Sequence, residues 1–258
     1  MLAFTRTIPS PNPVLTQLFE ILRQRGFQVD VGIASELLAD PGQLRATHDL
    51  YILKSHSQLW LSLAGIYHEQ GAAMLNPYPA CLAVHDKIGS AYRLAAAGIP
   101  TPTTWVTGDV NLLKALAAER PLIIKPYNGG RGLGIQIVKD AGDLAALPPP
   151  PEPVMVQEYI TGRSEELKLY VIGDQVFGIH KRDATRYPCP VSEPVAALGR
   201  RCGRLFGLGL YGLDVLESAD GPVVIDVNYF PSYKGVPDAA GLLADYIADY
   251  AHGHCRAT

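Results

Sequence analysis

The segment 210–235 constrains the fold more than any other part of the chain, because two apolar runs there flank a turn signal. The dipeptide Asp220-Gly221 between the runs favours a β-hairpin. Such a hairpin places Asp214 on one strand near Asp226 on the other, and Asn228 shares the face of Asp226. Two carboxylates and an amide oxygen in apolar surroundings are costly to bury without a cation, so we predict a Mg²⁺ site shared with phosphates. A pair of aspartates that only cap turns is the simpler alternative.

The first 80 residues alternate short strands and helices, which predicts a small parallel sheet of the α/β type. No G-x-G-x-x-G follows the first strand, expected over 2–5, so no dinucleotide site is predicted there. Lys54 and His56 lie at the carboxyl end of the strand expected over 49–55, where open α/β sheets bind ligands. A substrate contact and a solvated strand end are equally good interpretations of these two residues.

A lysine followed by glycines marks the middle of the chain. Lys125 ends an apolar strand, where an unpaired ammonium is costly to bury. The glycine-rich segment 128–134, NGGRGLG, lets backbone N–H groups approach phosphate oxygens, and the lysine adds charge. It is not a Walker A loop, because the lysine precedes the glycines. Lys87 lies near the start of a helix expected over 81–97 and by itself reads as an exposed lysine.

A proline-rich spacer at 148–153 separates this part from the last third of the chain. The strand expected over 154–160 carries Gln157-Glu158-Tyr159. Two further strands, 167–172 and 176–179, pair through a Gly-Asp turn. Helices are expected over about 195–206 and 238–250, before and after the predicted metal hairpin.

Composition bounds the class of protein. Of the 258 residues 48% are hydrophobic and 18% charged, which excludes global disorder and supplies a sizeable core. The net charge of −3 gives no indication of nucleic-acid binding. The four cysteines are scattered without a C-x-x-C pair, as in a reduced intracellular protein. No apolar run reaches spanning length and no signal-peptide core is visible, so we expect a soluble cytoplasmic protein.

The order of these features resembles the ATP-grasp superfamily over about residues 81–241. The resemblance implies an α/β (α+β) ATP-grasp fold with three subdomains, at 1–80, 81–156 and 157–258, and ATP between two antiparallel sheets. It implies Mg²⁺, as two ions with Mn²⁺ as a substitute, at Asp214, Asp226 and Asn228. The residues that it implies for ATP are Lys87 and Lys125 at the phosphates, Gly129, Gly130 and Gly132 in a covering loop, Gln157, Glu158 and Tyr159 at the adenine, and Glu165 or Glu166 at the ribose.

Within the superfamily the sequence resembles two groups. The segment 224–233, VIDVNYFPSY, resembles the ATP-grasp inositol polyphosphate kinases, as does Asp226 where ligases usually carry glutamate. Lys181-Arg182, ahead of 190–194, also resembles the kinases. The loop 129–134 and the spacing through 76–104 instead resemble the glutamate-adding ligases of RimK type, and the loop histidine of the inositol kinases is missing.

We therefore expect transfer of the ATP γ-phosphoryl group to a small anionic acceptor, with Lys125, Lys168 and Arg182 meeting the charge of the transferring group. A kinase for a polyol such as an inositol phosphate is favoured. A RimK-like carboxylate–amine ligase acting through an acyl phosphate is the alternative, and a nucleotide-binding regulator without turnover is a third. We expect a monomer or homodimer that binds neither nucleic acid nor membrane. The residues expected at the acceptor are Lys54, His56, Arg131, Arg182, Ser232 and Lys234.

Overall fold

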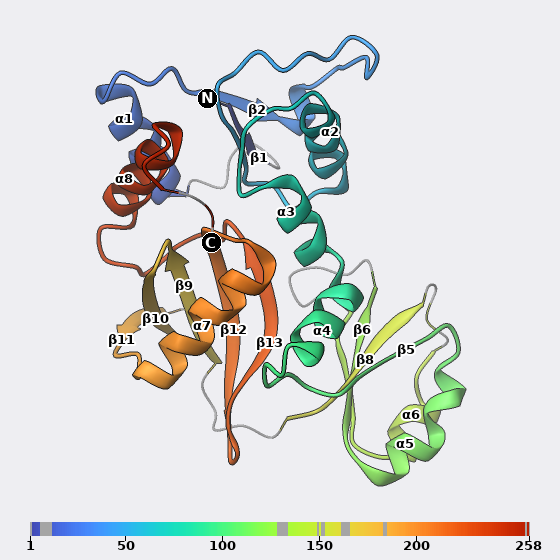
Figure 1. The fold of residues 1–258 in the computed structure, drawn as a ribbon. Helices are drawn as coiled ribbons and strands as arrows, with labels where there is room; N and C mark the ends of the chain where they lie inside the picture. Colours follow the sequence, from blue (N-terminus) through green and yellow to red (C-terminus); the bar gives the residue numbers. More distant parts are fainter. Residues whose placement is uncertain are drawn as a thin grey trace. The chain divides into compact units, whose positions relative to one another are not determined.

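The computed structural model describes residues 2–5, 12–127, 134–148, 150, 153–160, 166–182, 185–255 and 257. The strands of these residues form three sheets (Figure 1). Contacts group the chain into two compact units: unit 1 is Met1–His85, Glu165–Val215 and Asp226–Thr258, and unit 2 is Asp86–Ser164 and Leu216–Ile225. In the described part of the chain, no helix is long and apolar enough to cross a membrane. The subdomain boundaries expected from the sequence stay a prediction.

The N-terminal sheet of unit 1 is parallel, as the sequence predicts, with the strand order β2-β1-β3-β4. Asn12 caps the first helix by accepting a hydrogen bond from the backbone of Val14, and Ser57 caps the second in the same way. The elements are β1 (Leu2–Thr5), α1 (Pro13–Gln24), β2 (Asp30–Ile33), the short 3₁₀ turn η1 (Ala34–Glu36), β3 (Tyr51–Leu53), α2 (Gln58–Glu69), β4 (Met74–Leu75) and α3 (Tyr78–His85).

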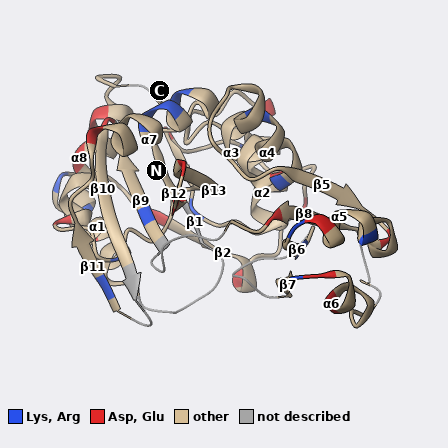
Figure 2. Cartoon of the chain, turned by 90° about the horizontal axis from the view of Figure 1, so that it is seen from below, with Lys and Arg blue, Asp and Glu red and all other residues tan. Residues whose placement is uncertain are grey.

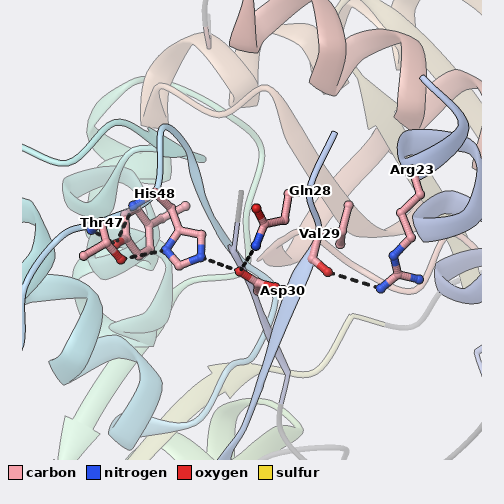
Figure 3. A network of polar contacts seen from close by, with 7 residues as sticks. Arg23, Gln28, Val29, Asp30, Thr47 and His48 are labelled. Carbon is pink, nitrogen blue, oxygen red and sulfur yellow. Dashed lines mark hydrogen bonds and ion pairs between the residues drawn. The ribbon is translucent and has the colours of Figure 1, made fainter. Parts of the chain in front are cut away.

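A polar network ties the start of β2 to the loop before β3 (Figure 3). The His48 Nε2 atom lies 2.7 Å from a carboxylate oxygen of Asp30, which also accepts a hydrogen bond from the Gln28 amide at 3.4 Å. The hydrogen bond with His48 holds the pKa of the Asp30 carboxyl below its ordinary value. The network is exposed or only partly buried, so it fastens a loop and does not support the core.

Unit 2 holds an antiparallel sheet of order β5-β8-β6-β7. One face packs on a cluster that includes Leu122, Ile124, Val138, Val154 and Val156. The elements are α4 (Lys87–Ala96), β5 (Thr104–Thr107), η2 (Val110–Leu113), α5 (Lys114–Glu119), β6 (Leu122–Pro126), β7 (Gln136–Val138), α6 (Ala141–Ala145) and β8 (Val154–Glu158).

The helix expected over 81–97 is two helices, and the prediction of one continuous helix is wrong. Asp86 separates them, because its side chain accepts hydrogen bonds from the backbone N–H groups of Ile88 and Gly89, both at 3.1 Å. This is the N-cap arrangement, in which the capping residue leaves helical geometry. Lys87 is therefore the first residue of α4.

The second sheet of unit 1 has five strands in the order β11-β10-β9-β12-β13, of which the hairpin tip Leu216–Ile225 is grouped with unit 2. The predicted hairpin at its edge is confirmed, since β12 ends at Ser218 and β13 begins at Gly221. In this sheet β10 pairs with β11 and with β9, and β9 pairs with β12, all antiparallel. The elements are β9 (Glu166–Ile172), β10 (Gln175–Arg182), β11 (Thr185–Cys189), α7 (Glu193–Phe206), β12 (Leu210–Ser218), β13 (Gly221–Tyr229) and α8 (Ala239–Ala251).

Side chain to backbone hydrogen bonds connect the two sheets of unit 1. The fully buried Asn76 side chain accepts from the N–H groups of Gly209 and Leu210 and donates to the carbonyl of Leu210 at 2.7 Å. The Tyr229 hydroxyl, at the end of β13, donates to the carbonyl of Ser55 at 2.9 Å. Because these buried bonds satisfy groups that water cannot reach, the Asn76 bonds fix the segment after β4 against the start of β12, and the Tyr229 bond fixes the segment after β3 against the end of β13.

Candidate active site

The sheet of unit 2 presents Lys125 on the face opposite its hydrophobic cluster. On β6 the residues Leu122 and Ile124 belong to the cluster, so Lys125 alternates to the other face. Gln157 alternates in the same way on β8. The Lys125 ammonium donates to the Gln157 side-chain oxygen at 2.6 Å.

The Gln157 amide has a fixed orientation. The residue is 2% exposed, and its side-chain nitrogen donates to the Thr104 hydroxyl at 3.1 Å. Thr104 in turn donates to the carbonyl of Pro102 at 3.0 Å. Because the amide nitrogen of Gln157 donates to Thr104, the amide oxygen is the atom that faces Lys125. Thr104 has no sequence signal of its own and was not among the expected site residues.

The expected adenine hinge has its backbone N–H groups already in use. The N–H of Glu158 donates to the carbonyl of Thr103, and that of Tyr159 to the carbonyl of Pro121, both at 3.0 Å. The Glu158 carboxylate accepts a hydrogen bond from the Thr103 hydroxyl at 3.3 Å. Contact of this hinge with a base stays a prediction.

The five-stranded sheet of unit 1 carries the predicted metal ligands. Lys168 on β9 and Asp214 on β12 are register partners, and the ammonium lies 2.5 Å from a carboxylate oxygen. On β13 the Asn228 amide donates to an Asp226 carboxylate oxygen at 3.0 Å, which confirms that these two residues share a face. Figure 2 shows the basic position of β9 in blue within this sheet.

This donor set fits Mg²⁺. Asp214, Asp226 and Asn228 supply oxygen ligands, which hard divalent cations prefer, and all three are partly buried. Among the described residues, no group of three or more His, Cys, Asp or Glu is placed to hold a metal ion by itself. A site of two carboxylates and one amide therefore relies on oxygens from another molecule, as Mg²⁺ bound with phosphates does.

The expected acceptor residues Lys54 and His56 follow the end of β3. The Lys54 ammonium lies 5.4 Å from the centre of the Phe230 ring, and the His56 ring stacks on Tyr229 with centroids 4.1 Å apart. Burial lowers the pKa of Lys54 to about 8. The Ser232 hydroxyl lies 3.5 Å from that of Tyr170. The aromatic partners were not predicted, although 229–233 is visibly aromatic in the sequence.

Lys234 is partly buried in the segment after β13. The remaining expected site residues, or their side chains, fall in parts of the chain that the structure does not describe. Gly129, Gly130, Arg131, Gly132 and Glu165 lie outside the described residues, as do the side chains of Glu166 and Arg182. Their expected roles in covering the phosphates, holding the ribose and binding the acceptor stay predictions.

The structure combines a parallel N-terminal sheet with two antiparallel sheets, of which one carries Lys125 and the other carries Asp214 and Asp226. This combination defines a class of nucleotide-dependent α/β enzymes, those of the ATP-grasp fold. Residues 84–249 match the model of the RimK-like ATP-grasp domain. The chain belongs to this family, as the resemblance of its sequence indicates. Enzymes of the ATP-grasp type use ATP and Mg²⁺.

Relatives and solved structures agree with this assignment. A probable alpha-L-glutamate ligase of Stenotrophomonas maltophilia (strain K279a) is 31% identical in a match that covers 67% of this chain. The match spans 66% of the length of that relative. A RimK domain ATP-grasp protein from Sphaerobacter thermophilus DSM 20745 has a TM-score of 0.80 at 23% identity, over 95% of this chain and 98% of that one. The ATP-grasp ligase PsnB, complexed with minimal precursor, Mg and ADP, has a TM-score of 0.73 at 22% identity, over 97% and 98%.

These findings favour the ligase alternative over the kinase that the sequence favoured. The kinase interpretation rested on segment 224–233, on Asp226 and on Lys181-Arg182. The first two lie in β13 and its continuation, which carry two of the predicted metal ligands. Residues that hold Mg²⁺ would serve phosphoryl transfer to any oxygen acceptor, so they do not distinguish a hydroxyl from a carboxylate.

Proposed function

We propose that the protein is an ADP-forming carboxylate–amine ligase. The observation that carries the proposal is the match of residues 84–249 to the RimK-like family. In the proposed reaction a substrate carboxylate attacks the γ-phosphorus of ATP, and the bond to ADP breaks. An amine then attacks the acyl carbon, loses a proton and displaces phosphate. An inositol-type kinase would need only the first step, with a hydroxyl as nucleophile.

Asp214, Asp226 and Asn228 would hold Mg²⁺, with two ions and replacement by Mn²⁺ as further parts of the proposal. When bound, Mg²⁺ neutralises phosphate charge during transfer. The side-chain contacts in the sheet support this assignment. Asp214 is held by Lys168 at 2.5 Å and Asp226 by Asn228 at 3.0 Å, so both carboxylates are positioned by neighbours in the sheet.

Lys125 would bind the phosphates, because its ammonium is positioned by a buried neutral amide. Lys87 would assist from the first position of α4 with its ammonium, because Asp86 already caps the N–H groups of this turn. Lys168 and Arg182 would meet the charge of the transferring group. Gln157, Glu158 and Tyr159 would form the adenine hinge, Gly129, Gly130 and Gly132 would cover the phosphates, and Glu165 or Glu166 would hold the ribose.

The amine and carboxylate substrates would be an amino acid and a small molecule or peptide. The relative named a probable alpha-L-glutamate ligase supports glutamate as the first amino acid to test. The acceptor residues would be Lys54, His56, Arg131, Ser232 and Lys234. We propose a monomer or homodimer.

The test is incubation with Mg-ATP, a panel of amino acids and peptides, and hydroxylamine. We expect release of ADP, not AMP, that depends on the carboxylate substrate, and a hydroxamate formed when hydroxylamine traps the acyl phosphate. Asp226→Asn should abolish both signals. A stable phosphorylated product that forms without an amine and yields no hydroxamate would establish the kinase instead. Tight ATP binding without turnover of any substrate would indicate a regulator.

A further inference from the structure

Lys54 is a cation without a carboxylate partner in the part of the chain that the structure describes. It directly follows β3, a strand of a parallel sheet, at the carboxyl edge where such sheets bind ligands. Its contact there is the face of Phe230, 5.4 Å away. An ammonium partly removed from water is stabilised by an aromatic ring far less than by an anion.

The ring of Phe230 is held in place at a cost to the backbone. Phe230 has a φ of +33°, in the left-handed region that non-glycine residues rarely adopt. The residue is 2% exposed, and its N–H donates to the carbonyl of Leu210 at 2.8 Å. Conformations of this kind persist where the surroundings fix them, and they cluster at ligand sites. Phe230 directly follows β13 and is two residues after Asn228, so the ring beside Lys54 is close in sequence to the proposed metal ligands.

The neighbouring contacts fix the same edge. The Tyr229 hydroxyl donates to the carbonyl of Ser55, the residue after Lys54, and the ring of Tyr229 stacks on His56. Tyr229 is fully buried and Ser55 is 3% exposed. The two residues that directly follow Lys54 are thus both held to the end of β13. A surface lysine needs no such clamp, because its head group is free to reach water.

We propose that Lys54 is the centre of an anion subsite that binds a substrate carboxylate. The inference rests on the proposed ligase function and deepens it by naming the charge of the substrate. A carboxylate suits a single compact ammonium, whereas a metal ion is excluded by the positive charge. The lowered pKa of Lys54 has the direction expected of a cation that lacks its counter-ion, because desolvation disfavours the charged form.

The test measures binding of glutarate, a dicarboxylate, against glutaramide, its neutral amide counterpart, by calorimetry without ATP. We expect the wild-type protein to bind glutarate at least roughly tenfold more tightly, as one charge-assisted hydrogen bond allows. Lys54→Met keeps the aliphatic stem and should remove that difference, while Lys54→Arg should retain part of it. Lys114→Met is the matched control, because it removes the same charge from an exposed position on α5 and should change nothing.

A second measurement uses only the wild-type protein, in case Lys54→Met does not fold. Lys54 is modified with acetic anhydride, and the modified peptide is quantified by mass spectrometry. Protection by glutarate but not by glutaramide supports the subsite. Equal protection by both ligands, or glutarate affinity unchanged in a folded Lys54→Met protein, overturns it.

These outcomes are separable from those of the proposed function. Lys54-dependent glutarate binding with no hydroxamate from any substrate would leave the subsite and refute the ligase. Hydroxamate formation with glutarate binding that ignores Lys54 would leave the ligase and refute the subsite.

Discussion

Each antiparallel sheet holds a lysine with a close hydrogen-bond acceptor, but the acceptors differ in charge. In unit 2 the Lys125 ammonium lies 2.6 Å from the neutral amide oxygen of Gln157. In unit 1 the Lys168 ammonium lies 2.5 Å from the carboxylate of Asp214. Both contacts join neighbouring regions of adjacent strands, and both pairs are partly buried.

The positive charge of Lys125 stays available to a ligand, whereas the positive charge of Lys168 is balanced by a carboxylate. A neutral amide orients Lys125 without cancelling its charge, which suits a contact to phosphate. The carboxylate of Asp214 balances the charge of Lys168, and a metal ion at Asp214 would compete with that ammonium for the same oxygens, which would let the ammonium meet the transferring group. The contact in unit 2 therefore suits the proposed phosphate site, and that in unit 1 suits the proposed metal site.

The largest effect is expected from the acidic strands of unit 1. Asp226→Asn and Asn228→Ala should each lower kcat more than about 100-fold, since even outer partners of metal ligands cost 10–100-fold. Asp214→Asn should do nearly as much. The fold should survive, because the changes remove ligands and little core volume, and melting temperatures serve as the control. Wild-type rates in all three proteins at saturating Mg²⁺ would show that the metal lies elsewhere.

Removal of the charge in unit 2 should come next. Lys125→Met keeps the aliphatic stem on β6 but removes the ammonium, so we expect weaker ATP binding and a kcat lower by about 100-fold. Calorimetry with ATP and steady-state kinetics measure the two effects. Lys114→Met, on the exposed face of α5, is the matched control and should behave as wild type. Unchanged ATP affinity and rate would make Lys125 a structural lysine.

The orienting amide should matter less than the charge that it orients. Gln157→Leu preserves volume but leaves Lys125 without this acceptor, and we expect a KM for ATP raised on the order of tenfold. Thr104→Val removes the hydroxyl that fixes the amide and should give a smaller rise, which Thr104→Ser should reverse. A purely structural role predicts the opposite pattern, with a lower melting temperature and an unchanged KM.

Local signals in the sequence were sufficient for the hairpin that carries the metal ligands. The Asp220-Gly221 turn and the alternation on its strands determine that Asp226 and Asn228 share a face, and the Asn228–Asp226 hydrogen bond confirms it. The order of motifs along the chain similarly indicated the ATP-grasp fold. Both inferences depend on residues that are close in sequence or on their linear order.

Contacts between distant strands could not be predicted, because they depend on register. Lys168 and Asp214 are 46 residues apart, and no local pattern sets them opposite each other. The strand β11 was missed because Pro188 argues against a strand, yet β11 is an edge strand where proline is tolerated. The break at Asp86 was missed because the apolar spacing continues through it, and only its capping hydrogen bonds reveal it.

The smallest effect is expected from an ion pair that is only partly buried and belongs to neither proposed site. Asp30 and His48 form such a pair in the N-terminal sheet, at 2.7 Å (Figure 3). Because His48 holds the pKa of Asp30 below its ordinary value, the contribution of Asp30 to stability is fully present above that ordinary value, about 4. It is lost as the pH falls further, through the pKa of the folded protein.

His48→Ala should therefore lower the free energy of unfolding slightly at pH 5, and the difference from wild type should vanish towards pH 2. Urea unfolding followed by tryptophan fluorescence across this range measures it. Asp30→Asn should give the same small loss at pH 5, and the double variant should lose no more than either single one, because both changes break one contact. ATP affinity should stay unchanged in all three proteins. A decrease in kcat as large as that of Lys125→Met would mean that the Asp30–His48 pair is coupled to the active site. The charged contacts of the proposed site could then no longer be distinguished from those that only hold a loop.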